Sequence, residues 1–216
     1  MRKPSTVTTG TRTRLLETAG QLFRWQGFHA TGLDEILKRS GTPKGSLYHY
    51  FPGGKDQLAI EALRYVSGLI EQTASVILSS NSDPLTAVRM LFEFTAKTLS
   101  ESDFRDGCPI AAVTLDVASD RNLIREACEQ SLQKWLDVFV QHFRRAGLTT
   151  ARAKTIATLC LASLEGGLIL SRAQRSAVPL NEIAIELTGV IQSMLPRTIK
   201  PYTRRISSGS RIATDA

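Results

Sequence analysis

Cysteine is scarce in this sequence of 216 residues, with only Cys108, Cys128 and Cys160 present. These three are too few and too widely spaced for a disulfide scaffold or a structural zinc site, and they favour a reducing compartment. Acidic residues are also in short supply, because 20 Asp and Glu face 27 Lys and Arg and leave a formal net charge of +7. A basic chain favours a polyanionic partner, since bound positive charge releases counterions from phosphate backbones.

Signals for secretion and membrane insertion are missing or weak. Residues 1–10 are followed by no apolar signal segment, so we expect a cytoplasmic protein. The stretch closest to a membrane span is 155–171, which Glu165 interrupts. A span needs about 20 mostly apolar residues, and a charged side chain in lipid is costly. We therefore expect a buried helix here and no membrane partner, with a membrane span as the alternative.

Signatures of catalysis and of cofactor binding are absent as well. Gly54-Lys55 matches part of a phosphate-binding loop, but that motif requires glycine at position 49 and Ser or Thr at position 56, where His49 and Asp56 stand. The three histidines show no metal-ligand spacing, and no Gly-x-Ser-x-Gly motif occurs. We expect a protein that is not an enzyme and holds no cofactor or metal.

Apolar residues recur with helical spacing throughout, and no segment alternates as a strand between hairpin turns. With 42% hydrophobic residues the chain can bury a sizeable core, and we expect an all-α protein. Residues 1–55 carry nine Lys and Arg against three Asp and Glu, residues 56–196 carry 13 against 16, and residues 197–216 carry five against one. Polyanion binding is therefore expected in the first quarter and secondarily in the last twenty residues, with an ordinary solvated charged face as the alternative.

The first expected helix ends at Gly27. Its apolar face consists of Leu15, Leu16, Ala19, Leu22 and Phe23. Thr31 and Asp34 then have the spacing of a capping box, which predicts a second helix that ends near Ser40. Gly41 follows at once and can take a left-handed turn conformation without steric cost.

A third, short helix is expected from Thr42-Pro43, as its cap and first residue, to about Phe51, where Pro52 stops it. Two short helices joined through a glycine are typical of a helix-turn-helix. A spacing of about 100° per residue turns Leu47, Tyr50 and Phe51 inward. The residues left outward, which can meet nucleic acid, are Lys44, Gly45, Ser46, Tyr48 and His49. Thr31 and Lys55 are expected to add phosphate contacts, and the alternative is an ordinary helical surface.

The rest of the chain predicts longer amphipathic helices. Their expected ranges are 55–79, 85–99, 109–118, 123–143, 149–174 and 179–195, with Asp83 as the cap of the second and Gly147 after the fourth. Leu69 and Leu123 are placed on the apolar faces of the first and fourth. The last two helices are so apolar that pairing with a second copy is the economical way to cover them, and packing within one subunit is the alternative. Gly166 and Gly167 suggest a close helix approach there.

A cavity for a small effector is expected among the helices 85–99, 109–118, 120–145 and 150–175. Its candidate lining residues are Phe92, Phe104, Cys108, Trp135, Phe139 and Glu165, with core packing as the alternative for each. Glu165 is the strongest candidate, because a carboxylate within an apolar helix needs a partner.

The N-terminal segment resembles the DNA-binding domain of the TetR family of transcriptional regulators. The resemblance rests on Thr13-Arg14-Leu15-Leu16 through Phe23, Gly27-Phe28-His29-Ala30-Thr31, Gly41-Thr42-Pro43-Lys44-Gly45-Ser46-Leu47-Tyr48-His49-Tyr50-Phe51 and Lys55-Asp56-Gln57-Leu58. It implies a dimer of all-helical subunits, each with a three-helix DNA-binding domain and a larger C-terminal domain that binds an effector and dimerises. The positions that it implies as DNA contacts are Thr31, Thr42, Pro43, Lys44, Gly45, Ser46, Tyr48, His49 and Lys55.

One departure from many members is the extra glycine in Pro52-Gly53-Gly54-Lys55. Together with Gly107-Cys108-Pro109-Ile110-Ala111 and Glu165-Gly166-Gly167, it is similar to a branch that includes drug- and flavonoid-responsive repressors of Bacillus. The resemblance implies a sequence-specific repressor that a small effector releases from a palindromic operator, and a regulator that needs no ligand is the alternative. The expected organisation is a flexible N-terminus at 1–10, a DNA-binding domain at 11–55, an effector-binding and dimerisation domain at 56–196 and a basic flexible tail at 197–216.

Overall fold

The computed structural model describes residues 10–117 and 121–195, and within these ranges every regular element is an α-helix. The helices are α1 (Thr11–Gln26), α2 (Leu33–Ser40), α3 (Lys44–Tyr50), α4 (Gly54–Ser79), α5 (Pro84–Glu101), α6 (Pro109–Val117), α7 (Asn122–Arg145), α8 (Thr150–Gln174) and α9 (Val178–Met194). The all-α prediction is confirmed. The predicted basic tail lies outside the described residues, as does almost all of the predicted flexible N-terminus.

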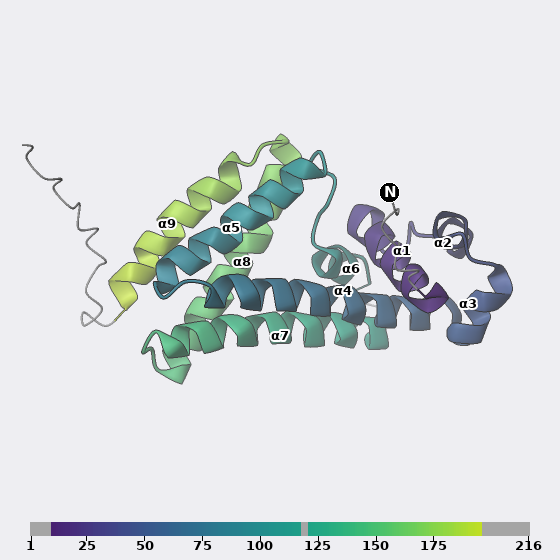
Figure 1. The fold of residues 1–216 in the computed structure, drawn as a ribbon, viewed down its shortest axis with the longest axis horizontal. Coiled ribbons are helices and arrows are strands. Elements are labelled where there is room, and N and C mark those ends of the chain that lie inside the picture. Colours follow the sequence, from purple (N-terminus) through teal and green to yellow (C-terminus); the bar gives the residue numbers. More distant parts are fainter. Residues whose placement is uncertain (1–9, 118–120, 196–216) are drawn as a thin grey trace, which may run out of the picture.

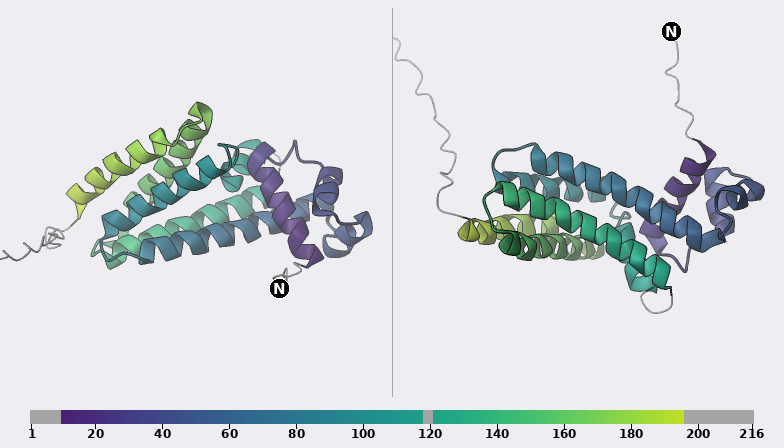
Figure 2. Two further views of the ribbon diagram at one scale, coloured as in Figure 1. Left: turned by 45° about the horizontal axis from the view of Figure 1, so that its top comes forward. Right: turned by 90° about the horizontal axis from the view of Figure 1, so that it is seen from below.

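The helices form a small group at one end of an elongated body (Figure 1). Helices α1, α2 and α3 make up the small group, and α4 runs from it along the length of the body beside α7 (Figures 1 and 2). Helices α5, α8 and α9 pack together against α4 and α7, at the end of the body away from α1, α2 and α3. Because α4 is continuous over 26 residues, it connects the small group to the body as one helix.

The core of the small group is the one that the sequence predicts. Leu15, Leu16, Ala19, Leu22 and Phe23 are all buried on α1, and α1 ends at Gly27, whose φ is 76°. A Cβ atom built on Gly20 would lie only 2.5 Å from Val66 Cγ1 of α4. Glycine at position 20 therefore lets α1 and α4 approach closely.

Both predicted threonine caps are wrong. Thr31 is completely buried and its hydroxyl donates to the carbonyl oxygen of Gly27 at 2.7 Å, so Gly32 occupies the cap position of α2. The hydroxyl of Thr42 donates to the carbonyl oxygen of Ser40, and α3 begins one residue later than predicted, with Pro43 as its cap. In both cases the threonine hydroxyl is oriented toward a carbonyl oxygen of the preceding turn, and the residue after the threonine takes the cap position.

The helices of the body agree with the predicted ranges to within about two residues. The backbone N–H of Thr86 donates to the carboxylate of Asp83 at 2.9 Å, which confirms Asp83 as the cap of α5. Two apolar positions were assigned to the wrong environment, because Leu69 is 49% exposed and Leu123 is 68% exposed. Leu69 faces a cavity described below rather than the packed core.

Helix α8 is long and apolar enough to cross a membrane by length and composition, and only 33% of its most apolar stretch is buried in the single chain. Gly167 packs against α9, since a Cβ atom there would lie 2.7 Å from Leu180 Cδ2, whereas a Cβ on Gly166 would meet open space. Gly167 therefore provides a close helix approach within the subunit, which is the alternative to the predicted pairing with a second copy. Large apolar side chains remain exposed along α8 and α9 at Leu159, Ile169, Leu170, Val178, Ile185 and Val190.

His142 holds the connection between α4 and α5 from the last turn of α7. Its Nε2 lies 3.0 Å from the carbonyl oxygen of Pro84, and because a carbonyl can only accept, the ring is neutral with its proton on Nε2 or doubly protonated. Burial lowers the pKa of His142, against the raising effect of the Pro84 and Leu78 carbonyls. The folded protein therefore binds the second ring proton of His142, the one that makes the ring positively charged, less tightly than the unfolded chain does.

The free energy of unfolding should fall as the pH drops below about 6.5, the pKa of an unperturbed histidine, until the lower folded pKa is reached. Between pH 7.5 and 5.5 the loss from His142 is expected to be up to about 1.4 kcal/mol. Urea unfolding at fixed protein concentration should show a smaller loss for His142→Asn. Replacing the exposed His29 by Asn should leave the wild-type loss in place, and an equal loss in all three proteins would contradict this assignment.

Candidate nucleic-acid interface and ligand cavity

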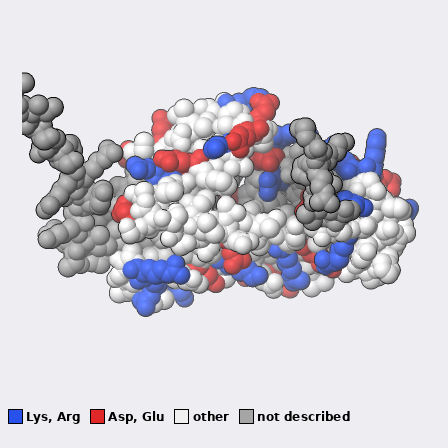
Figure 3. Space-filling view, viewed as in Figure 1, with Lys and Arg blue, Asp and Glu red and all other residues white. Residues whose placement is uncertain are grey.

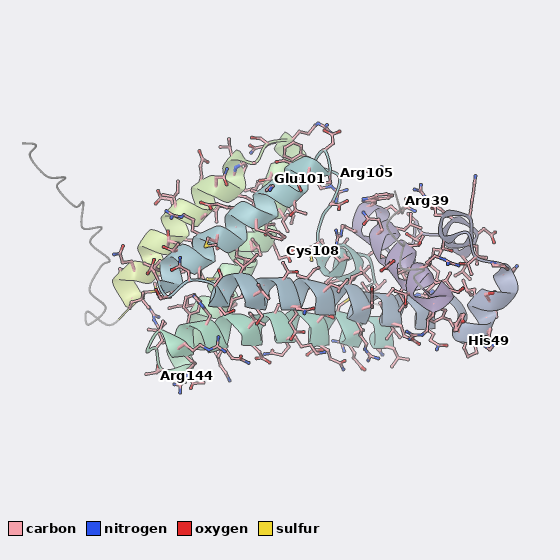
Figure 4. All side chains as sticks on the ribbon, in the orientation of Figure 1. Arg39, His49, Glu101, Arg105, Cys108 and Arg144 are labelled. Atoms are coloured by element: carbon pink, nitrogen blue, oxygen red, sulfur yellow. The ribbon has the colours of Figure 1, made fainter. Side chains whose placement is uncertain are left out.

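Helix α3 presents a polar outer face and a buried inner one. Leu47 of α3 and Phe51, the residue after the end of the helix, are completely buried, as the helical spacing predicts. Lys44, Gly45 and His49 are exposed, Ser46 is half-buried, and Tyr48 is 46% exposed. His49 lies at the outer end of the molecule, away from the body (Figure 4). The outward set predicted from the sequence thus shares one surface.

Tyr50 is the residue of α3 that the spacing placed wrongly. It is predicted to face inward, but its side chain is 38% exposed. The helix ends at Tyr50, and its ring packs edge-on against His49 at a centroid distance of 5.0 Å instead of entering the core. Phe51, which follows the helix in a non-helical backbone conformation, is buried together with Leu47.

The other predicted DNA contacts occupy different surroundings. Pro43 is exposed beside Lys44, whereas Thr31 and Thr42 are buried in the turns before α2 and α3. Lys55 is half-buried in the first turn of α4, and its Nζ lies 4.1 Å from the centre of the Phe28 ring. Burial and then the neighbouring Arg121 guanidinium lower the pKa of Lys55.

Positive charge is less segregated in space than it is in the sequence. Lys and Arg atoms are visible around the end formed by α1, α2 and α3, but a dense group also lies at the opposite end of the body (Figure 3). Arg144, in the last turn of α7, is at that far end (Figure 4). The acidic balance of residues 56–196 therefore hides a local basic surface.

A largely apolar cavity of about 300 Å³ lies inside the body. Helices α4, α5, α7 and α8 and the segment 106–109 form its walls, and α1 contributes Arg24. Four of the six residues predicted to line an effector cavity do so, namely Cys108, Trp135, Phe139 and Glu165. Of the four helices predicted to surround an effector cavity, α5, α7 and α8 line this cavity, whereas α6 contributes only Pro109 at its first position.

Phe92 and Phe104 are not among the lining residues, so these two predictions are wrong. Phe92 is completely buried, and Phe94, two positions further and about 200° around α5, faces the cavity in its place. Phe104 lies in the connection after α5 with a φ of 58°.

Sequence reasoning also missed the wall that α4 supplies, because its apolar stripe was assigned to the core. Leu69, Ile70 and Thr73 line the cavity from α4. Thr73 was one available signal, since it is a polar residue on the helix face that otherwise carries Leu69, Ile70 and Ile77. Arg24 and Asp106 were missed because they are 82 residues apart in the sequence, and no local pattern predicts that they are in contact.

Glu165 and Cys108 form the polar pair of the cavity. The carboxyl group of Glu165 has a hydrogen bond with the Cys108 thiol, which is the partner that the sequence required for a carboxylate in an apolar helix. Burial raises the pKa of Glu165, and the hydrogen bond from Cys108 offsets part of that rise. Burial also raises the pKa of the Cys108 thiol well above its ordinary value, and the Glu165 charge adds to it. In both groups burial thus favours the neutral form more than water does.

Known families account for both halves of the chain. Residues 15–62 match the model of bacterial regulatory proteins of the tetR family, and residues 84–186 match the C-terminal domain of LmrA/YxaF-like transcriptional regulators. Two Bacillus subtilis regulators, YxaF and LmrA, are each 34% identical to the chain. The YxaF match covers 84% of this chain and 95% of the relative, and the LmrA match covers 80% and 92%.

Solved structures share the fold. The reduced form of NemR from Escherichia coli aligns with a TM-score of 0.71 at 23% identity, over 84% of this chain and 97% of that one. A regulatory protein TetR from Rhodobacter sphaeroides aligns with a TM-score of 0.72 at 23% identity, over 83% and 97%. The arrangement of three small helices on an elongated helical body is therefore one that these regulators also have.

Replacing Glu165 by Gln should stabilise the protein at neutral pH. A raised folded pKa means that the native state holds the proton more tightly than the unfolded chain, so stability is lost as the pH rises above about 4.5 toward that folded value. A neutral amide avoids this loss, which is of the order of 1.4 kcal/mol per pKa unit, and about 1 kcal/mol corresponds to 2–4 °C in a chain of this size. Thermal unfolding at pH 5 and pH 8 should show the gain mainly at pH 8. Glu126→Gln, on the exposed surface of α7, is the control, and an equal gain there would count against the argument.

Proposed function

Because the chain belongs to the TetR family of DNA-binding transcriptional regulators, we propose that it is a homodimeric repressor that a small effector releases from a palindromic operator. In this proposal residues 11–55 bind DNA, residues 56–196 bind the effector and dimerise, and the protein works in the cytoplasm by binding alone, without catalysis. The outward polar face of α3 is the observation that carries the DNA-binding part.

The shape of α3 suits the major groove. Seven residues span roughly 10 Å at about 1.5 Å per residue, close to the groove width of about 12 Å. Gly45 has open space where a side chain would stand, so the backbone can approach DNA there. Lys44, Tyr48 and His49 provide donors for phosphates or base edges. Pro43 and Ser46 flank them.

The remaining predicted contacts fit a supporting role. Thr31 and Thr42 are buried, so we assign them to fixing the turns that orient α2 and α3. Lys55, packed over Phe28 at the start of α4, reaches DNA only if its ammonium group leaves that ring. Direct recognition therefore depends on α3 itself.

Exposed apolar side chains on α8 and α9 support a dimer. Six large apolar residues are uncovered on these two helices, and a second copy would cover them in a four-helix interface. Gly166 has open space above it on α8 and Gly189 has open space above it on α9, so the helices of two subunits can approach closely. A two-fold dimer presents two α3 helices, which would read two half-sites related by the same symmetry.

The cavity supports the effector. Its volume of about 300 Å³, apolar walls and few polar groups suit an organic molecule of modest size. The protein would have one conformation that fits the operator and another that does not. An effector would act by binding more tightly to the conformation that does not fit. A ligand-independent regulator would leave operator affinity unchanged by every compound that alters Trp135 fluorescence.

Lys44→Ala and Tyr48→Phe should each weaken binding to a DNA fragment selected from random sequence by the wild-type protein. We expect a loss of about fivefold or more for each, because single contacts of this kind contribute roughly 1–3 kcal/mol. If Lys44 touches a phosphate, its removal should also reduce the salt dependence of binding by about one unit of slope.

Lys134→Ala is the matched control, since it removes the same charge from the exposed middle of α7. Fluorescence anisotropy measures all the affinities, and circular dichroism checks helicity. Wild-type affinity in both the Lys44 and Tyr48 variants would overturn the assignment of α3 as the recognition helix.

Ile185→Glu should convert the dimer to a monomer, because it places a charge in the apolar face of α9, where Ile185 is 63% exposed in the single chain. Leu115→Glu is the control, since Leu115 is 79% exposed on α6, outside that face. Sedimentation velocity should give a dimer for the wild type and for Leu115→Glu. A dimeric Ile185→Glu protein would place the interface elsewhere.

A further inference from the structure

Asp106 gathers three side chains of α1 on one carboxylate. Its Oδ1 accepts hydrogen bonds from Gln21 Nε2 at 2.9 Å and from Trp25 Nε1 at 2.6 Å. Its Oδ2 accepts from Arg24 Nη1 at 3.1 Å, which is also an ion pair. The residue lies in the connection between α5 and α6, so one side chain of the body contacts three residues of α1. Helix α1 belongs, with α2 and α3, to the small group of helices that is called the DNA-binding group below.

The same connection forms part of the cavity wall. Asp106, Gly107 and Cys108 line the cavity, and so does Arg24 from α1. The Nε atom of Arg24 is buried and has no hydrogen-bond partner, so one donor of this guanidinium is left for another acceptor. Cys108 and Arg105 mark the course of this connection beside α1 (Figure 4). A molecule in the cavity would therefore touch both members of the Arg24 and Asp106 pair.

Helix α8 reaches the same place. Arg172 Nη2 donates to the carbonyl oxygen of Trp25 at 3.2 Å, near the end of α1. A Cβ atom on Gly107 would lie 2.9 Å from Arg172 Nη1, so the arginine passes through a gap that a larger residue would narrow. The DNA-binding group, the cavity wall and the helix that carries the exposed apolar face thus meet around Asp106.

The backbone before Asp106 is in an unfavourable conformation. Asp103 has a φ of 54° and Phe104 has a φ of 58°, a left-handed region that bulky residues seldom adopt. Such conformations persist only where the surroundings hold them, and they are frequent in segments that change shape. The contacts of Asp106 with α1 are part of what holds this connection.

We propose that Asp106 is the positioning residue that couples the cavity to the DNA-binding group. In the state described here its three hydrogen bonds fix α1, and through α1 they fix α3. A ligand that displaces the 106–108 segment or takes the free donor of Arg24 loosens this contact and lets α1 move. The inference rests on the proposed function and adds to it the residue through which the two sites communicate.

A second contact between the two parts provides a matched control. The carboxylate of Asp116 in α6 accepts a hydrogen bond from the backbone N–H of His29 at 2.7 Å, in the turn between α1 and α2. Asp116 does not line the cavity. Asp106→Asn and Asp116→Asn therefore remove the same charge and each weakens a contact to the DNA-binding group, but only the first contact adjoins the cavity.

The experiment uses the reciprocity of coupled sites, so it needs no known effector. If the cavity influences operator binding, operator binding must change the cavity by the same free energy. Cys108 reports on the cavity wall, and the buried Cys128 and Cys160 serve as internal references. The rate of N-ethylmaleimide addition to each cysteine is measured by peptide mass spectrometry, with and without selected operator DNA at saturation for each variant.

We expect operator DNA to change the Cys108 rate severalfold in the wild type and in Asp116→Asn, and to change it by less than twofold in Asp106→Asn. Trp25→Phe, which removes one of the three hydrogen bonds and keeps an aromatic ring, should show an intermediate change. The proposal is overturned if Asp106→Asn responds to DNA like the wild type, or if the wild-type rate does not respond although DNA is bound. A wild-type protein that binds no selected DNA would instead overturn the proposed function, and with it this inference.

Discussion

The close packing of α1 on α4 is the contact on which the rest of the structure depends. Helices α2 and α3 are short, and α3 buries Leu47 and Phe51 only because α1 and the start of α4 provide a surface for them. Val66 of α4 meets α1 at Gly20 and also lines the cavity. A single layer of side chains therefore separates the ligand cavity from the helix that positions α3, and the two sites share one rigid support.

Two acidic residues at the cavity differ in their surroundings, and this difference defines their roles. Asp106 receives three donors from α1, so its charge is well compensated and it can act as a structural anchor. Glu165 has the Cys108 thiol as its partner, and burial raises its pKa. The cavity therefore has an anchored carboxylate at its edge and, in its wall, a carboxyl group whose neutral form is favoured by burial.

Local signals made most of the fold predictable. The buried face of α1, the stop at Gly27, the turn at Gly41 and the end of α3 before Pro52 each follow from a few adjacent residues, and the structure has them. The threonine caps failed because the partner of a hydroxyl depends on the fold of the preceding turn. Phe92 was mistaken for Phe94 because periodicity gives a helix two apolar sides without saying which one faces a cavity. Asp106 could not be found, since its partners are 81 to 85 residues away in sequence.

The central claim is that two copies of this chain, joined through α8 and α9, present two α3 helices to DNA. The most direct test is the symmetry of the sequences that the protein selects from random DNA. We expect an inverted repeat whose half-sites lie about one helical turn apart, so that both are read from one side of the duplex, or at a longer spacing set by the dimer. Enrichment of a single unrepeated motif, or no enrichment at all, would contradict it.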